Sequence, residues 1–142
     1  MSEKKIMNRD QLIKLIKEWR RIGERIVFTN GCFDLVHLGH IDYLEKARQL
    51  GSQRPVIDEY ARTRLIASLQ FVDVVILFDE LTPIELIKDI QPNILVKGGD
   101  YIIENIVGAD IVIQNGGIVH SMPLMQGYST TSIIQSIQNH RE

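Results

Sequence analysis

The sequence predicts an α/β fold of the Rossmann-like kind, in which a parallel sheet carries helices on both faces. Short apolar and β-branched runs alternate along the chain with segments of helical periodicity. Most of these runs are apolar throughout, which is typical of strands buried on both faces. The 142 residues, 44% of them hydrophobic, are enough for one domain with a sizeable core. We therefore expect a single domain over residues 1–142, with an N-terminal helix in 1–24 and the core in 25–142.

Helices are expected where apolar residues recur at helical spacing between capping residues and glycines. The first covers Asn8 to Gly23, with Asn8 or Asp10 as its cap and Gly23 at its end. Thr82-Pro83-Ile84-Glu85 looks like a capping box with proline at the first helical position. The other helices are expected over residues 38–50, 58–70 (capped by Asp58), 83–90, 108–115 and 129–139.

Strands are expected in the apolar runs over residues 25–30, 72–78, 93–97 and 118–124. Ligand sites in such folds lie beyond the carboxyl ends of the strands. The residues that carry chemistry gather there, in the loop that follows the first strand, in residues 97–101 and in residues 127–131. These three loops are therefore the candidate site.

The loop Thr29-Asn-Gly-Cys-Phe-Asp-Leu-Val-His-Leu-Gly-His40 holds the candidate catalytic residues. His37 and His40 are three residues apart and project from one face at a predicted helix start. Imidazoles beside free helix N–H groups attract phosphate, and Gly39 lets phosphate approach the backbone. The pattern favours nucleotidyl transfer, in which such donors stabilise charge that grows as pyrophosphate leaves. The alternatives are two surface histidines, or a zinc site made by Asp34, His37 and His40 without the usual fourth ligand.

The other two loops offer groups for phosphate and sugar, each with a simpler alternative. Small hydroxyl residues in Gly127-Tyr-Ser-Thr-Thr-Ser132 can bind an anion at a helix start, or Ser129 or Thr130 only caps the helix. Lys97-Gly-Gly-Asp-Tyr101 can hold a sugar or phosphate, or it is a glycine turn with a solvated ion pair. Arg54 and Arg62 can reach pyrophosphate, or they are solvated.

Composition excludes several classes of protein. A net charge of −2 and a pI near 6.1 argue against a nucleic-acid binder. The single cysteine, Cys32, cannot form an internal disulfide, which fits a reducing cytosol. No apolar run approaches the roughly 18 residues that span a bilayer, and the polar N-terminus lacks a signal-peptide core. We therefore expect a cytoplasmic protein without nucleic-acid or membrane partners.

Three stretches resemble the cytidylyltransferase-like nucleotidyltransferase family, whose HxGH fold is marked by G-x-F-D-x-x-H-x-G-H and a late S-T-T helix start. Within that family, the chain is most similar to the D-glycero-β-D-manno-heptose 1-phosphate adenylyltransferase branch. The resemblance covers nearly the whole chain and is carried by Phe28-Thr-Asn-Gly-Cys-Phe-Asp-Leu-Val-His-Leu-Gly-His40, Leu95-Val-Lys-Gly-Gly-Asp-Tyr101 and Gly127-Tyr-Ser-Thr-Thr-Ser-Ile-Ile134.

The resemblance implies that ATP and heptose 1-phosphate react, with Mg²⁺, to give ADP-heptose and pyrophosphate for lipopolysaccharide or other surface glycans. It implies that His37 and His40 hold the triphosphate and stabilise the transition state, and that no residue is a dedicated metal ligand. The nucleotide would meet Asn30, Gly31, Cys32, Phe33, Gly39, Lys97, Gly127, Tyr128, Ser129, Thr130 and Thr131. The sugar phosphate or the pyrophosphate would meet Gly98, Asp100, Tyr101, Arg54 and Arg62.

The same resemblance sets the partners and the rival functions. Many relatives carry a fused sugar kinase, for which 142 residues leave no room, so the kinase is expected to be a separate chain. A glycerol-phosphate cytidylyltransferase is the rival enzyme. Class I aminoacyl-tRNA synthetases also use an H-x-G-H element, but this chain is too short and has no Lys-Met-Ser-Lys-Ser loop.

The chain departs from the family after Gly51, where a strand and a loop with a phosphate-binding lysine are expected to be missing. The missing length is on the order of twenty residues. The first strand is then left with an open edge, unless residues 72–78 move beside it or a second subunit of a homo-oligomer covers it. Loss of one phosphate contact commonly costs on the order of 10²–10³ in rate. A nucleotide-binding remnant with little turnover is therefore the alternative to an active enzyme.

Overall fold

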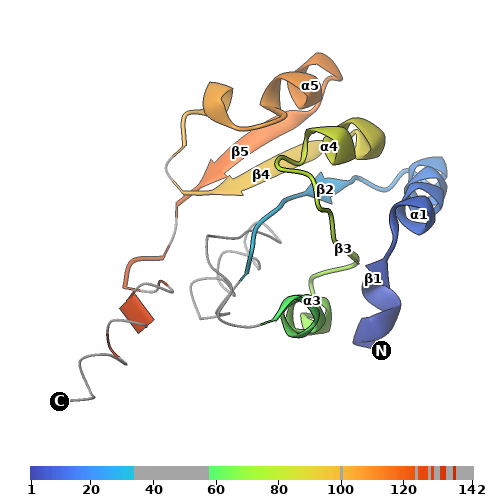
Figure 1. The fold of residues 1–142 in the computed structure, drawn as a ribbon. Coiled ribbons are helices and arrows are strands. Elements are labelled where there is room, and N and C mark those ends of the chain that lie inside the picture. The colour runs from blue at the N-terminus through green and yellow to red at the C-terminus, as the bar shows by residue number, and fades with distance from the viewer. Residues whose placement is uncertain are drawn as a thin grey trace.

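The computed structural model describes residues 1–33, 58–99, 101–123 and 125–127, together with residues 129, 132, 133 and 136 (Figure 1). Parallel strands and helices in these residues confirm the α/β class. The main sheet has three strands in the order β2-β4-β5, namely β2 (Val27–Phe28), β4 (Ile94–Gly98) and β5 (Ile118–Met122).

All strand pairs of the main sheet are parallel, which brings the carboxyl ends of β2, β4 and β5 to one edge. Val27 pairs with Ile94 of the central strand β4, and Ile94 pairs with Ile118 of β5. The chain between β4 and β5 forms a short 3₁₀ helix, η2 (Ile103–Asn105), and the helix α5 (Ala109–Gln114). The loops that follow the three strands therefore start from the same edge of the sheet.

The helices begin where the capping residues predict, with one exception. Helix α1 (Arg9–Arg21) has Asn8 as its N-cap, and a capping box joins Asn8 and Gln11 through hydrogen bonds of 2.9 and 3.0 Å. Helix α3 (Glu59–Ser68) starts after Asp58, whose carboxylate accepts a 3.0 Å hydrogen bond from the Ala61 N–H. Both predicted caps are confirmed.

The capping box predicted at Thr82-Pro83-Ile84-Glu85 is wrong. Helix α4 (Ile84–Ile90) begins one residue later than expected, with Pro83 as its N-cap and no side-chain capping bond. Thr82 then lies outside the cap position, and proline has no side-chain acceptor to replace its hydroxyl. Glu85 pairs instead with Lys88, whose Nζ donates to Oε1 over 2.6 Å.

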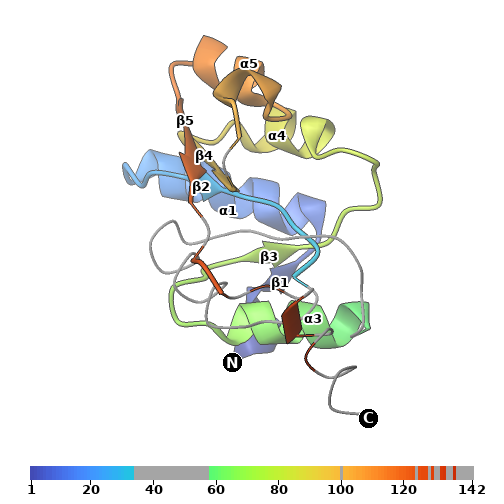
Figure 2. The ribbon, with the colours of Figure 1, turned by 90° about the vertical axis from the view of Figure 1, so that its left-hand side faces the viewer.

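The core lies on both faces of the main sheet. On one face, Phe28, Leu95 and Val119 pack with apolar residues of α1, α4 and α5. On the other face, Val96 packs with Ile66 of α3 and with apolar residues after that helix. Figure 2 shows α4 and α5 on one side of β4 and β5 and α3 well away on the opposite side.

The strand predicted over residues 72–78 is shorter than expected and lies in a different sheet. Only β3 (Val75–Ile76) is strand, and it pairs in parallel with β1 (Ile6–Met7), with Ile6 opposite Val75 and Met7 opposite Ile76. The prediction that this segment moves beside the first strand is wrong, because β3 bonds to the N-terminal segment and β2 bonds to β4. Neither β1 nor the 3₁₀ helix before it, η1 (Ser2–Lys5), was expected from the sequence.

The strand predicted over residues 25–30 is shorter than expected, because only β2 (Val27–Phe28) is strand. The remaining predicted elements lie within two residues of their predicted bounds or fall on residues that are not described. Helix α5 begins after Gly108, and β4 and β5 lie within one residue of their predicted starts. The helix expected over 38–50 falls wholly on residues that the structure does not describe. In the segment expected as the last helix, 129–139, only residues 129, 132, 133 and 136 are described.

Candidate functional site

The loop after β2 begins at the carboxyl edge of the main sheet and is tied to its neighbours. The Thr29 hydroxyl donates to the Val96 carbonyl of β4 over 3.1 Å, which extends the contact between the two strands. Phe33 adopts a left-handed backbone conformation, with φ of 45°. Asn30 is half-buried, whereas Gly31 and Cys32 are exposed. The backbone of residues 30–33 is therefore held at the strand end, as a loop that approaches a ligand through its backbone requires.

Arg62 links helix α3 to this loop. Its Nη1 donates to the Cys32 carbonyl over 2.6 Å, while its Nε is buried and has no hydrogen-bond partner among the described residues. The alternative that Arg62 is merely solvated is wrong. The contact brings a guanidinium, which prefers phosphate and carboxylate groups, to the predicted nucleotide loop.

Lys97 places a second cation at the same edge, near the end of β4. The side chain is half-buried, and removal from water lowers the pKa of its ammonium group, an effect that the charge of a Cys32 thiolate partly offsets. Its Nζ lies 5.8 Å from the centroid of the Tyr101 ring, within the range of a cation–π contact. A partly desolvated ammonium interacts more strongly with a phosphate than a fully hydrated one.

The turn after β4 is compact. Gly99 has φ of 121°, a conformation that side chains rarely adopt, and its N–H donates to the Met122 carbonyl over 2.7 Å. A methyl group added to Gly99 would lie 2.7 Å from Cε2 of Tyr101, so the ring packs directly on the glycine backbone. The predicted glycine turn is present, with Tyr101 half-exposed beside it.

The last predicted loop shows a helix cap. The Ser129 hydroxyl accepts a 3.0 Å hydrogen bond from the Ser132 N–H, and the Ile133 N–H donates to the Ser129 carbonyl over 3.1 Å. Ser129, one of the two predicted capping residues, therefore caps the helix. Gly127, just before it, has φ of 83°.

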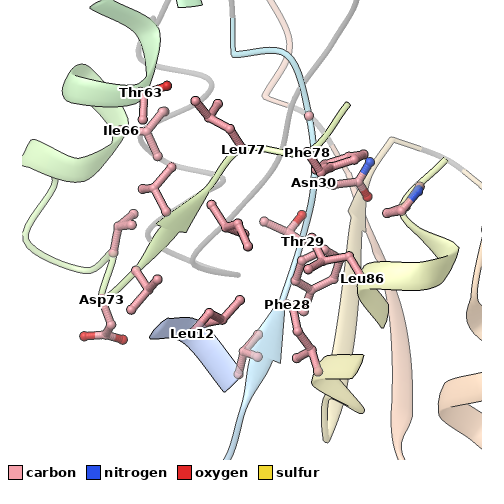
Figure 3. A pocket seen from close by; sticks show the side chains of 18 of the residues that line it. Leu12, Phe28, Thr29, Asn30, Thr63, Ile66, Asp73, Leu77, Phe78 and Leu86 are labelled. Atoms are coloured by element: carbon pink, nitrogen blue, oxygen red, sulfur yellow. The ribbon is translucent and has the colours of Figure 1, made fainter. Parts of the chain in front are cut away.

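A cavity of about 780 Å³ runs from the loop after β2 into the space between β2 and β3. Figure 3 shows Phe28, Thr29 and Asn30 on one side of it and Ile66 of α3 with Leu77 on the other. Its lining includes polar residues such as Arg62, Thr63 and Asp73, together with Leu12, Ile16 and Trp19 of the apolar face of α1. The strands β2 and β3, which both line the cavity, belong to different sheets.

The structure brings some predicted site residues together and does not describe others. Asn30, Gly31, Cys32, Phe33 and Arg62 line the cavity, and Lys97, Gly98 and Tyr101 lie at the end of the adjacent strand. Eight predicted site residues lie outside the described part of the chain, namely His37, Gly39, His40, Arg54, Asp100, Tyr128, Thr130 and Thr131. Asp34, named for the zinc alternative, also lies outside it.

The described residues contain neither a metal-binding cluster nor a membrane-spanning helix. They contain no cluster of three or more His, Cys, Asp or Glu side chains that could hold a metal ion. None of the helices in the described part of the chain is both long and apolar enough to cross a membrane.

One residue near the site, Ser121 of β5, has no signal in the sequence. It stands directly opposite Lys97 in the register of β4 and β5, and its hydroxyl contacts the backbone on both sides of residue 100. Ser121 and Lys97 are 24 residues apart in the chain, so their proximity cannot be predicted from local sequence patterns. Only the pairing of β4 with β5 brings them together.

Comparison with known proteins decides the family. The family model for cytidylyltransferase-like proteins matches residues 28–136, from β2 to the last predicted helix. This chain belongs to the cytidylyltransferase-like family. The predicted resemblance is thereby confirmed, and the match includes the three loops at the carboxyl edge.

Two curated relatives of this chain share one name. The chain is 42% identical to the bifunctional protein HldE of Koribacter versatilis, over 95% of this chain and 32% of that protein. It is 46% identical to the protein of the same name from Trichlorobacter lovleyi, over 96% of this chain and 31% of that protein. The chain therefore spans about a third of the length of the curated relatives it matches.

A solved structure supports the fold. The crystal structure of a lipopolysaccharide core biosynthesis protein from Thermoplasma volcanium matches 72% of this chain and 97% of its own, with a TM-score of 0.52 and 25% identity.

The alignments also show that the relatives contain residues that this chain lacks. The matches to the proteins of Koribacter versatilis and Geotalea uraniireducens run over 153 and 155 residues, more than the 142 residues of the chain. The extra residues therefore fall inside the matched region, which agrees with the predicted missing segment. Its location after Gly51 stays a prediction.

Proposed function

We propose that the chain transfers AMP from ATP to D-glycero-β-D-manno-heptose 1-phosphate, forming ADP-heptose and releasing pyrophosphate. In this reaction a phosphate oxygen of the sugar phosphate attacks the α-phosphorus of ATP, and the bond from that phosphorus to the pyrophosphate oxygen breaks. The product would serve lipopolysaccharide or another surface glycan. A reducing cytoplasm, in which a lone thiol such as Cys32 stays reduced, is the proposed compartment.

The observation that carries the proposal is the arrangement of loops at one edge of the main sheet. Because β2, β4 and β5 are parallel neighbours, the nucleotide loop, the Lys97 turn and the segment capped by Ser129 all follow strand ends at that edge. The two cations there, Lys97 and Arg62, suit a triphosphate. The likeness to proteins named for HldE and for lipopolysaccharide core biosynthesis supports the sugar phosphate as the acceptor.

The proposed roles follow the sequence prediction. His37 and His40 would donate N–H bonds to the phosphates as negative charge grows on them, and the backbone of residues 30–33 and 39 would approach the triphosphate. Lys97, Gly127 and the residues from Tyr128 to Thr131 would contact the nucleotide. Gly98, Asp100 and Tyr101 would contact the sugar phosphate, and Arg54 and Arg62 the phosphates.

Mg²⁺ would accompany the triphosphate rather than occupy a cage of protein ligands. Mg²⁺ commonly binds through substrate phosphates, water and one or two carboxylates. The described residues contain no cluster of three or more His, Cys, Asp or Glu side chains. Bound to the triphosphate, Mg²⁺ would neutralise phosphate charge, and no protein step is assigned to it.

A nucleotide-binding remnant with little turnover is the second candidate. It is favoured by the cavity between β2 and β3 and by the residues that the relatives hold and this chain lacks. We also propose that a homo-oligomer covers the edge of β2.

The purified chain incubated with ATP, Mg²⁺ and heptose 1-phosphate separates these functions through release of pyrophosphate. Release with ATP, and much less with CTP and glycerol 3-phosphate, supports the proposed reaction. Preference for CTP and glycerol 3-phosphate would instead support the rival cytidylyltransferase. ATP binding without any release would leave the remnant as the function.

A pair of histidine variants tests the catalytic assignment. His40→Ala should lower the rate by about 10²–10³, because a donor to the developing charge is lost. His120→Ala is the matched control, since His120 is exposed on β5 and has no proposed role. Equal rates for wild type and His40→Ala would contradict the role of His40.

A further inference from the structure

We propose that Ser121 is a positioning residue that holds the turn between Gly99 and Tyr101 in the shape that receives the sugar phosphate. The inference rests on the proposed function and goes beyond it, because neither the family match nor the sequence motifs point to this serine. Ser121 would act through the turn rather than by touching the reacting atoms.

The strand register puts Ser121 on the correct face. Lys97 and Ser121 are opposite one another in the parallel pair of β4 and β5, so their side chains leave the same face of the sheet. Leu95 and Val119, two residues earlier on each strand, mark this face as the one packed against α4 and α5. At the carboxyl end, beyond the covering core, the same face carries Lys97, Ser121 and the turn.

The Ser121 hydroxyl joins the two halves of the turn. It donates a short hydrogen bond to the Gly99 carbonyl and accepts a 3.0 Å hydrogen bond from the Tyr101 N–H. One hydroxyl therefore bonds to the backbone on both sides of residue 100. Two backbone bonds complete the junction, from the Gly99 N–H to the Met122 carbonyl and from the Tyr101 N–H to the Gly99 carbonyl.

This junction determines where Tyr101 lies. The ring packs on the backbone of Gly99 and lies 5.8 Å from the Lys97 ammonium, while half of the residue stays exposed. An exposed aromatic ring beside a cation and two glycines suits the apolar edge and the phosphate of a sugar phosphate. Without the Ser121 hydroxyl, the Tyr101 N–H keeps only its bond to Gly99, and the turn has more freedom.

Ser121→Ala tests the inference, with Ser121→Thr as the rescue variant and Ser68→Ala as the matched control. Threonine keeps the hydroxyl and suits a strand. Ser68 is exposed on α3 and donates only to the Arg64 carbonyl of its own helix. The readouts are the dissociation constants of heptose 1-phosphate and ATP by calorimetry, the KM and kcat values, and hydrogen exchange of the Tyr101 amide.

Ser121→Ala should weaken heptose 1-phosphate binding by roughly fivefold to tenfold, the loss expected for one hydrogen bond. ATP affinity and kcat should stay within about twofold, because Lys97 lies on β4 and keeps its backbone contacts. The Tyr101 amide should exchange faster. Ser121→Thr should restore all of these values, and Ser68→Ala should match wild type.

The outcomes distinguish this inference from the proposed function. If the wild type turns over and Ser121→Ala binds heptose 1-phosphate as tightly as the wild type does, the inference is overturned and the proposed function stands. If the wild type releases no pyrophosphate but Ser121→Ala selectively weakens its binding of sugar phosphate, the inference is supported and the transfer reaction is overturned. Equal losses for ATP and sugar phosphate, a Ser121→Thr variant that restores nothing, or a wild type that binds no sugar phosphate also overturn the inference.

Discussion

Lys97 shows how the fold changes the chemistry of a single side chain. Partial burial lowers the pKa of its ammonium group below the ordinary value of 10.5, because removal from water disfavours the charged form. The side chain therefore loses its charge at a lower pH than a free lysine does. The unfolded chain holds more protons between the folded-state pKa and 10.5, so this group makes the protein more stable as pH rises through that window.

The binding consequence of this pKa shift is testable. ATP affinity should begin to fall at a pH below 10.5, because the Lys97 ammonium that we propose faces the phosphates becomes neutral there. Lys97→Arg, which stays protonated over this range, should remove the alkaline decline. Titration of ATP at several pH values by calorimetry measures both. An identical decline in the arginine variant would show that another group titrates.

Two glycines at the ends of α5 allow a matched comparison of steric effects. Both have left-handed backbones, Gly108 with φ of 85° and Gly116 with φ of 76°. A methyl group on Gly108 would overlap Cδ1 of the fully buried Ile87, whereas one on Gly116 would meet nothing within 4 Å.

Gly108→Ala should therefore destabilise the fold by about 1–3 kcal/mol more than Gly116→Ala, which carries only the backbone penalty. Urea unfolding of the two variants measures the difference. Similar unfolding free energies would mean that Ile87 moves aside at little cost.

Helix α1 illustrates an element that neighbouring residues specify. Asn8 and Gln11 exchange hydrogen bonds at its start, and Leu12 and Ile16 bury its apolar face. The sequence limited this cap to Asn8 or Asp10, because a cap and the N–H group that it binds are about three residues apart. The start of α4 was predicted wrongly, because Thr82 and Glu85 have the spacing of a capping box while the helix begins after Pro83.

The cap of α1 predicts a stability change. Asn8→Ala should lower the free energy of unfolding by about 1 kcal/mol, since the Gln11 N–H loses its acceptor. Asn8→Asp keeps the acceptor and should remain near wild type. Urea denaturation of both variants checks the pair, and equal losses in the two would argue against the capping bond as the cause.

At the scale of the whole molecule, the main feature is the separation of β3 from the main sheet. The two sheets are formed by the pairs of β1 with β3 and of β2 with β4 and β5, and the cavity of about 780 Å³ lies between β2 and β3. Relatives contain additional residues in the matched region. We infer that a strand from those residues would join the two sheets.

Insertion of the missing segment of an HldE relative after Gly51 should raise both stability and activity. The new strand would fill the cavity, and its loop would bring the expected lysine, worth on the order of 10²–10³ in rate. Thermal unfolding and pyrophosphate release measure the two effects. A glycine-serine insertion of equal length is the control, and equal behaviour of the two insertions would contradict the inference.

The sequence by itself determined the α/β class, the Asp58 cap and, for two other helices, a choice of cap between Asn8 and Asp10 and between Ser129 and Thr130. These features depend on residues within a few positions of one another, whose spacing decides which faces are apolar and which N–H groups are capped. Only the tertiary structure decided that β3 pairs with Ile6 and Met7, and that Ser121 lies beside Lys97. Strand pairing joins segments far apart in the chain, and its partners are selected by burial and backbone hydrogen bonding across the whole molecule.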